Sequence, residues 1–108
     1  MDTHKHGRVE EIIRTLTGQF LARESETKSL ITVTKVEISD FGDMAYIFVT
    51  VFPEKEETKT LTSLKRLRSD LRLFIREHSK VMRIPTFDFD IDRGEKNRQR
   101  VDELSIKN

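Results

Sequence analysis

The segment from Leu61 to Arg83 (LTSLKRLRSDLRLFIREHSKVMR) constrains the fold of this chain more than any other part. Its apolar side chains recur every three or four residues, which is the spacing of one face of an α-helix. The residues on this face are Leu64, Leu67, Leu71, Phe74, Ile75, His78 and Met82. An amphipathic helix buries its apolar face against another element. The segment therefore predicts one long helix that packs on a small sheet and ends at Ile84-Pro85, because a residue before proline avoids the α region.

The same segment holds the main charge asymmetry of the chain. It carries seven basic side chains against two acidic ones, whereas the 108 residues together have a formal net charge of +1. Six of the basic residues fall on one side of the predicted helix, about 130° from the apolar face. These six, the basic stripe, are Lys65, Arg68, Arg72, Arg76, Lys80 and Arg83. Because Asp70 and Glu77 lie outside the stripe, we interpret it as a surface for a polyanion such as RNA; a solvated helix face is the alternative explanation.

Four other segments have regular patterns. Residues 8–24 repeat apolar side chains at helical spacing, and residues 30–38 and 44–52 are rich in β-branched and aromatic residues. These two strands flank the turn-forming sequence SDFGD, so we expect an antiparallel hairpin. The alternation of the first strand slips near Lys35, which predicts a bulge. The second strand is almost entirely apolar and should be central or covered on both faces. Residues 86–91 (TFDFDI) alternate cleanly and predict a third strand.

The order of these elements is helix, strand, strand, helix, strand. It predicts an α+β fold in which helices cover one face of a three-stranded sheet, with the third strand parallel to one partner. We expect a flexible N-terminal arm over residues 1–7, one domain over residues 8–92, and a short C-terminal tail or helix over residues 93–108. Most phenylalanines fit core positions, so exposed aromatic side chains for base stacking are not expected.

Composition and motifs argue against several classes of protein. There is no cysteine, and no run approaches the roughly 18 apolar residues that a membrane span needs. The N-terminus lacks the apolar segment of a signal peptide, so we expect a cytoplasmic protein. No nucleophile motif or phosphate-binding loop predicts an enzyme, and no cofactor is expected. His78 lies near the apolar face and is expected to be a hydrogen-bonded packing residue rather than a base.

Two patterns resemble metal sites only in part. Asp88, Asp90 and Asp92 begin like a calcium-binding loop, but the glycine and the final glutamate of such a loop are not at the required positions. We therefore expect these acids to form an outward strand face. His4 and His6 form an H-x-H pair without further ligands, so no metal site is predicted.

Several short motifs stand in the order in which the bacterial ribosome-binding factor A family has them. They are Arg8-Val9, ITVTKVEIS (residues 31–39), Asp40-Phe41 followed by AYIFVTVF, FIR (residues 74–76), KVMR (residues 80–83), and Ile84-Pro85 before a Phe-rich strand. Over residues 8–92 the chain thus resembles this family. The resemblance implies a type-II KH-like fold and a non-enzymatic factor that binds the small ribosomal subunit. It further implies a role in late maturation of the subunit's rRNA, including processing of the 5′ end, above all in the cold.

The resemblance also bears on the basic stripe. The last three residues of the stripe match basic positions of the family, and the first three extend the same face by helical geometry. The family has a small-residue kink in its long helix, whereas the aligned positions here read Leu71-Arg72-Leu73. The sequence therefore leaves open whether this helix bends. We expect a monomer whose partner is the small subunit and its rRNA, without a small-molecule substrate. The alternatives are a KH-like protein with another RNA target, or a protein–protein adaptor for an acidic partner.

Overall fold

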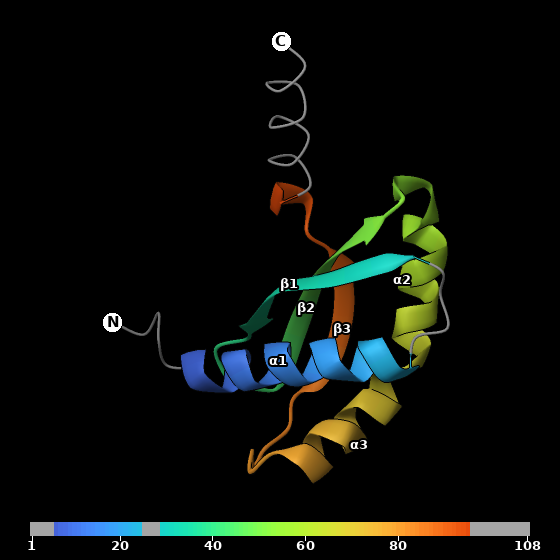
Figure 1. The fold of residues 1–108 in the computed structure, drawn as a ribbon. Coiled ribbons are helices and arrows are strands. Elements are labelled where there is room, and N and C mark those ends of the chain that lie inside the picture. The colour runs from blue at the N-terminus through green and yellow to red at the C-terminus, as the bar shows by residue number, and fades with distance from the viewer. Residues whose placement is uncertain (1–5, 25–28, 96–108) are drawn as a thin grey trace.

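The computed structural model describes residues 6–24 and 29–95. The expected N-terminal arm and C-terminal tail therefore lie mostly outside the described residues. In chain order the elements are α1 (Gly7–Glu24), β1 (Leu30–Ile38), β2 (Met44–Phe52), the 3-10 helix η1 (Glu54–Glu56), α2 (Glu57–Arg66), α3 (Arg68–His78) and β3 (Thr86–Ile91). Strand β2 is central, antiparallel to β1 and parallel to β3 (Figure 1). The predicted α+β fold, the hairpin and the parallel third strand are confirmed.

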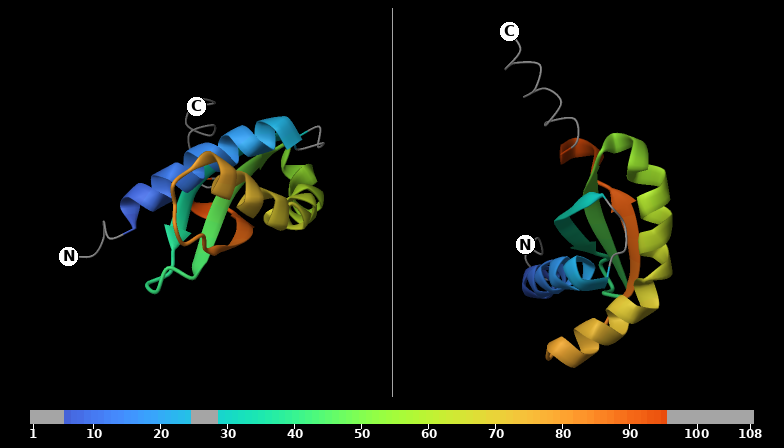
Figure 2. Two further views of the ribbon diagram at one scale, coloured as in Figure 1. Left: turned by 90° about the horizontal axis from the view of Figure 1, so that it is seen from below. Right: turned by 45° about the vertical axis from the view of Figure 1, so that its right-hand side comes forward.

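The hydrophobic core lies against one face of the sheet, which α1 crosses (Figures 1 and 2). The sheet contributes Ala45, Ile47, Val49 and Val51 from β2 and Phe87, Phe89 and Ile91 from β3; the helices contribute Ile13, Phe20 and Leu21 from α1, Leu64 from α2, and Leu71, Phe74 and Ile75 from α3. The opposite face of β2 stays open, with Tyr46 41% and Phe52 71% exposed. Strand β2 is therefore central but covered on one face only. Exposed aromatic side chains, which were not expected from the sequence, are therefore present on this face.

The predicted bulge in β1 is present at Thr34. Val33 pairs with Val49 and Lys35 pairs with Phe48, so Thr34 is the extra residue. The insertion shifts the alternation by one position, so that Ile31, Val33, Val36 and Ile38 all lie opposite buried residues of β2. The apparent slip in the pattern thus keeps the apolar residues of β1 on the core face.

Asp92, at the end of β3, departs from the expected outward strand face. Asp88 and Asp90 point away from the core, as expected, but Asp92 is buried. The Thr34 hydroxyl donates to Oδ2 of Asp92 (2.5 Å), and the backbone N–H of Glu95 donates to Oδ1 (3.0 Å). The carboxylate thus joins the bulge of β1 to the chain that follows β3. These two hydrogen bonds offset the cost of burying the carboxylate.

The predicted long helix is instead two helices, α2 and α3, which meet at Leu67. Leu67 has φ −92° and ψ 2°, and its N–H donates to the carbonyl of Leu64 (2.9 Å), a tighter turn than that of an α-helix. A straight helix over residues 61–83 would be about 35 Å long, whereas the six residues of β3 span about 20 Å. The bend turns α3 toward α1 (Figure 2, right). Buried residues of both helices therefore reach the same core.

Helix α3 also ends earlier than the end predicted for the long helix. It stops at His78 instead of Ile84, and Ser79 has extended backbone angles. The His78 ring donates from Nδ1 to the Phe74 carbonyl (2.8 Å) and stacks on the Phe74 ring, 4.0 Å between centroids. The hydrogen bond and the packing contact expected of His78 are therefore present, although the residue is exposed. Residues 79–85 form an irregular connection in which Met82 is 99% exposed, so its predicted place in the apolar face is wrong. Within the described residues, no helix is long and apolar enough to cross a membrane.

Candidate nucleic-acid interface

The bend at Leu67 divides the basic stripe. Lys65 at the end of α2 and Arg68 at the start of α3 both face β3, where their side chains reach the Asp88 carboxylate. The distance to Oδ1 is 3.0 Å from Lys65 Nζ and 3.4 Å from Arg68 Nη1. These two cations share one carboxylate, so their positive charge is partly neutralised within the molecule.

Asp88 is held in its ionised form by its surroundings. Burial raises the pKa of this carboxyl group, but the hydrogen bonds from Lys65 and from the Phe89 N–H, together with the charges of Lys65 and Arg68, outweigh that effect. The pKa of Asp88 is therefore lower than its ordinary value. The three-charge cluster persists at neutral pH and leaves Lys65 and Arg68 less available to an external anion.

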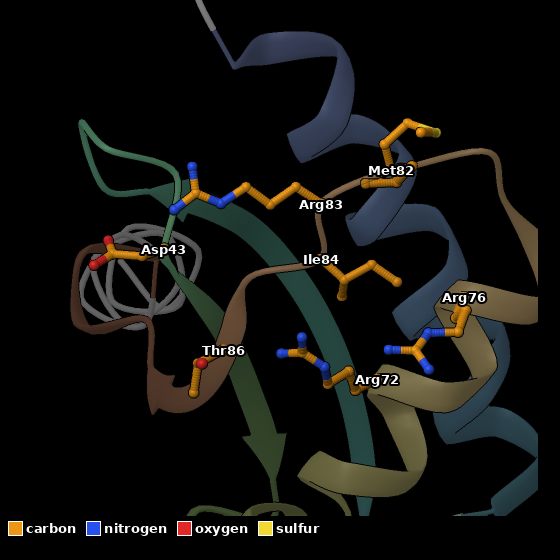
Figure 3. A pocket seen from close by; sticks show the side chains of 8 residues that line it. Asp43, Arg72, Arg76, Met82, Arg83, Ile84 and Thr86 are labelled. Atoms are coloured by element: carbon orange, nitrogen blue, oxygen red, sulfur yellow. The ribbon is translucent and has the colours of Figure 1, made fainter.

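The remaining arginines of the stripe gather around a hollow of about 410 Å³, which we call the arginine pocket (Figure 3). It is lined by Asp43, Arg72, Arg76, Val81, Met82, Arg83, Ile84 and Thr86. Its walls come from α3, from the connection over residues 79–85, from the β1–β2 turn and from the first residue of β3. Segments far apart in the sequence thus build one polar hollow.

Two arginines of α3 form one wall of the arginine pocket. Arg72 and Arg76 are four residues apart, so they project from the same side of the helix. Arg72 donates from Nη1 to the carbonyl of Pro85 (3.1 Å), which fixes its guanidinium group at the pocket. Figure 3 shows both side chains below Ile84, on the side of the pocket that α3 forms.

The opposite side of the pocket carries a cation and an anion. The side chain of Arg83 extends toward Asp43 (Figure 3). The Ser39 hydroxyl donates to the Asp43 carboxylate (2.7 Å), and this bond is the main reason why the pKa of Asp43 is lower than its ordinary value; the charge of Arg83 contributes less. Three arginines against one carboxylate leave the described lining with a net charge of +2.

Lys80 is the fifth of the six residues of the basic stripe. It is exposed in the connection over residues 79–85 and does not line the pocket. Sequence reasoning did not select Asp43, Met82 or Thr86 as site residues. Thr86 reaches the pocket because its N–H pairs with the Asp43 carbonyl (2.9 Å), a contact between distant segments without a local sequence signal. The helical spacing of the sequence places Met82 on the apolar face, but α3 ends at His78, so this spacing does not apply to Met82.

Among residues 6–24 and 29–95, the possible metal ligands do not assemble into a site. Within the described residues, no group of three or more His, Asp or Glu side chains is placed to hold a metal ion. His6 lies with Nε2 3.3 Å from the Asp40 carbonyl, and His4 lies outside the described residues. Asp92 uses its carboxylate oxygens for hydrogen bonds within the fold.

A three-stranded sheet with helices on one face, and basic residues on its bent helix pair, defines a small KH-like α+β domain with a surface suited to a polyanion. The chain belongs to the ribosome-binding factor A family, whose model, described as "Ribosome-binding factor A", matches residues 5–105.

Individual relatives are similar over much of the chain. Ribosome-binding factor A of Brevibacillus brevis is 38% identical over 63 residues, 57% of this chain and 52% of the relative. That of Thermodesulfovibrio yellowstonii is 34% identical over 74 residues, 68% of this chain and 63% of the relative. The chain therefore covers between about half and two thirds of the length of these curated relatives. The crystal structure of ribosome-binding factor A from Thermus thermophilus has a TM-score of 0.70 at 25% identity, and the match covers 81% of this chain and 96% of that one.

Proposed function

We propose that this chain binds the small ribosomal subunit and assists late maturation of its rRNA, including processing of the 5′ end. The family supports ribosome binding and a role in ribosome biogenesis. The observation that carries the choice of surface is the basic region formed by α3 and residues 79–85, in which Arg76, Lys80 and Arg83 are exposed and Arg72 is half-buried. Within the described residues, none of these four has an ion-pair partner.

The mechanism is electrostatic docking without chemical turnover. Each phosphate that a basic side chain neutralises releases condensed counterions, so the affinity comes mainly from charge and depends on salt. Helical RNA offers side chains little readout of base edges, so shape and 2′-hydroxyl contacts supply the specificity. The protein acts as a cytoplasmic monomer that holds a late conformation of the subunit until the rRNA is mature.

Cofractionation with small subunits on sucrose gradients tests this function. We expect the triple variant Arg72→Glu, Arg76→Glu, Lys80→Glu to lose association, because three attractive contacts with phosphate become repulsive. The measurement is the share of the protein that sediments with the small subunit. Circular dichroism of the free variant establishes that it remains folded.

A matched control reverses three other exposed charges: Arg8→Glu, Lys55→Glu and Lys59→Glu. The net charge changes by the same amount, but the substitutions lie outside the proposed surface, so association should persist. Undiminished association of the first triple variant would contradict the proposal and favour the protein–protein adaptor. Binding of RNA without cofractionation would favour a different RNA target.

A further inference from the structure

We propose that the arginine pocket is a binding site for one phosphate group of the RNA backbone, held jointly by Arg72 and Arg76. This inference rests on the proposed function, since it names the chemical group that a part of the basic surface recognises. It goes further because it assigns two arginines to a single phosphate. A general basic surface would attract the polyanion without assigning particular side chains to particular phosphates.

The first argument is the arrangement of hydrogen-bond donors. A guanidinium group has five N–H donors in a planar fork that matches two oxygens of a phosphate. Arg72 uses one terminal nitrogen, Nη1, on the carbonyl of Pro85. That bond fixes the side chain and leaves its other nitrogens for a ligand. Arg76 lies one helical turn away and lines the same pocket (Figure 3), so the two flexible side chains can be directed to one anion.

The second argument is the lack of internal neutralisation. Lys65 and Arg68 share Asp88 at 3.0 and 3.4 Å, but no ion pair joins Arg72 or Arg76 to any carboxylate in the described part of the chain. The one carboxylate that lines the pocket, Asp43, accepts a hydrogen bond from Ser39 and has Arg83 extending toward it. Two like charges on one wall repel each other, and an anion between them relieves that repulsion.

The third argument separates a backbone phosphate from a free ion. The hollow of about 410 Å³ is larger than a phosphate needs, and its lining includes the apolar side chains of Val81, Met82 and Ile84. Met82 is 99% exposed beside the arginines, although methionine is ordinarily a core residue. A nucleotide that places its phosphate at Arg72 and Arg76 can lay its sugar or base against Met82. Inorganic phosphate would leave that apolar surface uncovered.

The experiment measures the affinity for a fluorescent RNA oligonucleotide across a salt series. The variants are Arg72→Gln, Arg76→Gln and the double variant, with Arg66→Gln as the matched control. Arg66 is exposed at the end of α2 and lies outside the pocket, and its substitution removes the same charge. Thermal unfolding of each free variant checks that it is folded.

We expect each pocket variant to lose about fivefold or more in affinity, because one charge-assisted fork is removed, and Arg66→Gln to lose about twofold or less, because a distant charge is screened. Since both arginines hold one phosphate, the double variant should lose less than the product of the single losses. Its slope of log affinity against log salt should become shallower by about 0.7 to 0.9, the value for one phosphate.

Multiplicative losses with a slope change of about two phosphates would overturn the shared site. Equal losses for Arg66→Gln and Arg76→Gln would also overturn it, while leaving RNA binding by the surface intact. Failure of the unsubstituted protein to bind RNA would instead overturn the proposed function itself.

A second measurement distinguishes the two sources of phosphate. Thermal unfolding is followed with inorganic phosphate and with chloride at equal ionic strength, in the unsubstituted protein and the double variant. Stabilisation by phosphate only in the unsubstituted protein, together with weakened RNA binding by the variants, supports the proposal. The same stabilisation with unchanged RNA binding by the variants would identify a site for a small anion and overturn the assignment to RNA.

Discussion

At the residue scale, Asp92 is the only charged side chain that is buried within the described part of the chain. Its two oxygens accept hydrogen bonds from the Thr34 hydroxyl and from the Glu95 N–H. The first bond connects the extra residue of the β1 bulge to the end of β3. One carboxylate therefore links the two edge strands of the sheet.

Asp92→Ala should lower the free energy of unfolding by about 1–3 kcal/mol, because it removes the acceptor of the Glu95 N–H and leaves the Thr34 hydroxyl only the longer bond to the Phe48 carbonyl (3.2 Å). Urea denaturation followed by circular dichroism gives the value. Asp40→Ala, at an exposed position in the β1–β2 turn, is the control and should change stability by about 0.5 kcal/mol or less. Equal effects of the two substitutions would show that the buried carboxylate is not structural.

Asp88 predicts a dependence of stability on pH. Its pKa in the folded protein is lower than the ordinary 3.8, so ionised Asp88 stabilises the fold above that pH. The contribution is lost as the pH falls through the lower pKa of the folded state. Asp88→Asn should therefore reduce the free energy of unfolding at neutral pH, by about 1 kcal/mol at most for such a partly exposed cluster.

The measurement is urea denaturation of both proteins between neutral pH and acid. The difference between the unsubstituted protein and Asp88→Asn should shrink below the ordinary pKa of 3.8. Asp70→Asn, at an exposed position without an ion pair among the described residues, is the control and should show no comparable difference. A difference for Asp88→Asn that persists in acid would contradict the role of its charge.

At the element scale, the bend between α2 and α3 arises without proline or glycine, since residues 57–78 contain neither. Its cause is packing: Leu64 from α2 and Leu71, Phe74 and Ile75 from α3 are all buried in one core. Helical periodicity shows which side chains share one face of a straight helix, but it does not predict where the helix axis bends. The apolar spacing was therefore predicted correctly for these residues, whereas the bend was left open by the sequence and the predicted end of the helix was wrong.

Two leucines of α3 test which face the bend buries. Leu71 is fully buried, whereas Leu73 is 52% exposed. Leu71→Ala should lower the free energy of unfolding by about 2–5 kcal/mol, the cost of a cavity in a packed core. Leu73→Ala removes the same atoms from a largely exposed position and should cost about 0.5 kcal/mol or less. Similar values for both variants in urea denaturation would contradict the orientation of α3.

At the scale of the whole molecule, cations and carboxylates are distributed unevenly over the surface. The Asp88 cluster occupies the open face of the sheet beside α2, and the arginine pocket lies at the far end of α3. Six basic residues that seemed equivalent in sequence thus differ in their availability. Two are engaged with Asp88, two share one wall of the pocket, and Arg83 and Lys80 are exposed in the connection.

This distribution predicts the salt dependence of RNA binding. If Arg72 and Arg76 share a phosphate and Lys80 and Arg83 each contact one, three phosphates are neutralised. The slope of log affinity against log salt should then be about −2 to −3. Six independent contacts would give roughly −4 to −5. Fluorescence anisotropy at several salt concentrations measures the slope, and a value near −5 would show that Lys65 and Arg68 leave Asp88 to bind RNA.

Local patterns in the sequence were sufficient to predict the strands, the first helix, the position of the bulge and the excess of basic residues after Leu61. These are properties of neighbouring residues, and periodicity and composition report them directly. The order of the short motifs further indicated the ribosome-binding factor A family. Packing in the folded chain accounts for the other features: the helix bends at Leu67 and ends at His78, Asp92 is buried, and Lys65 meets Asp88, 23 residues along the chain. Each of these depends on which distant surfaces pack together, and the local pattern does not contain that information.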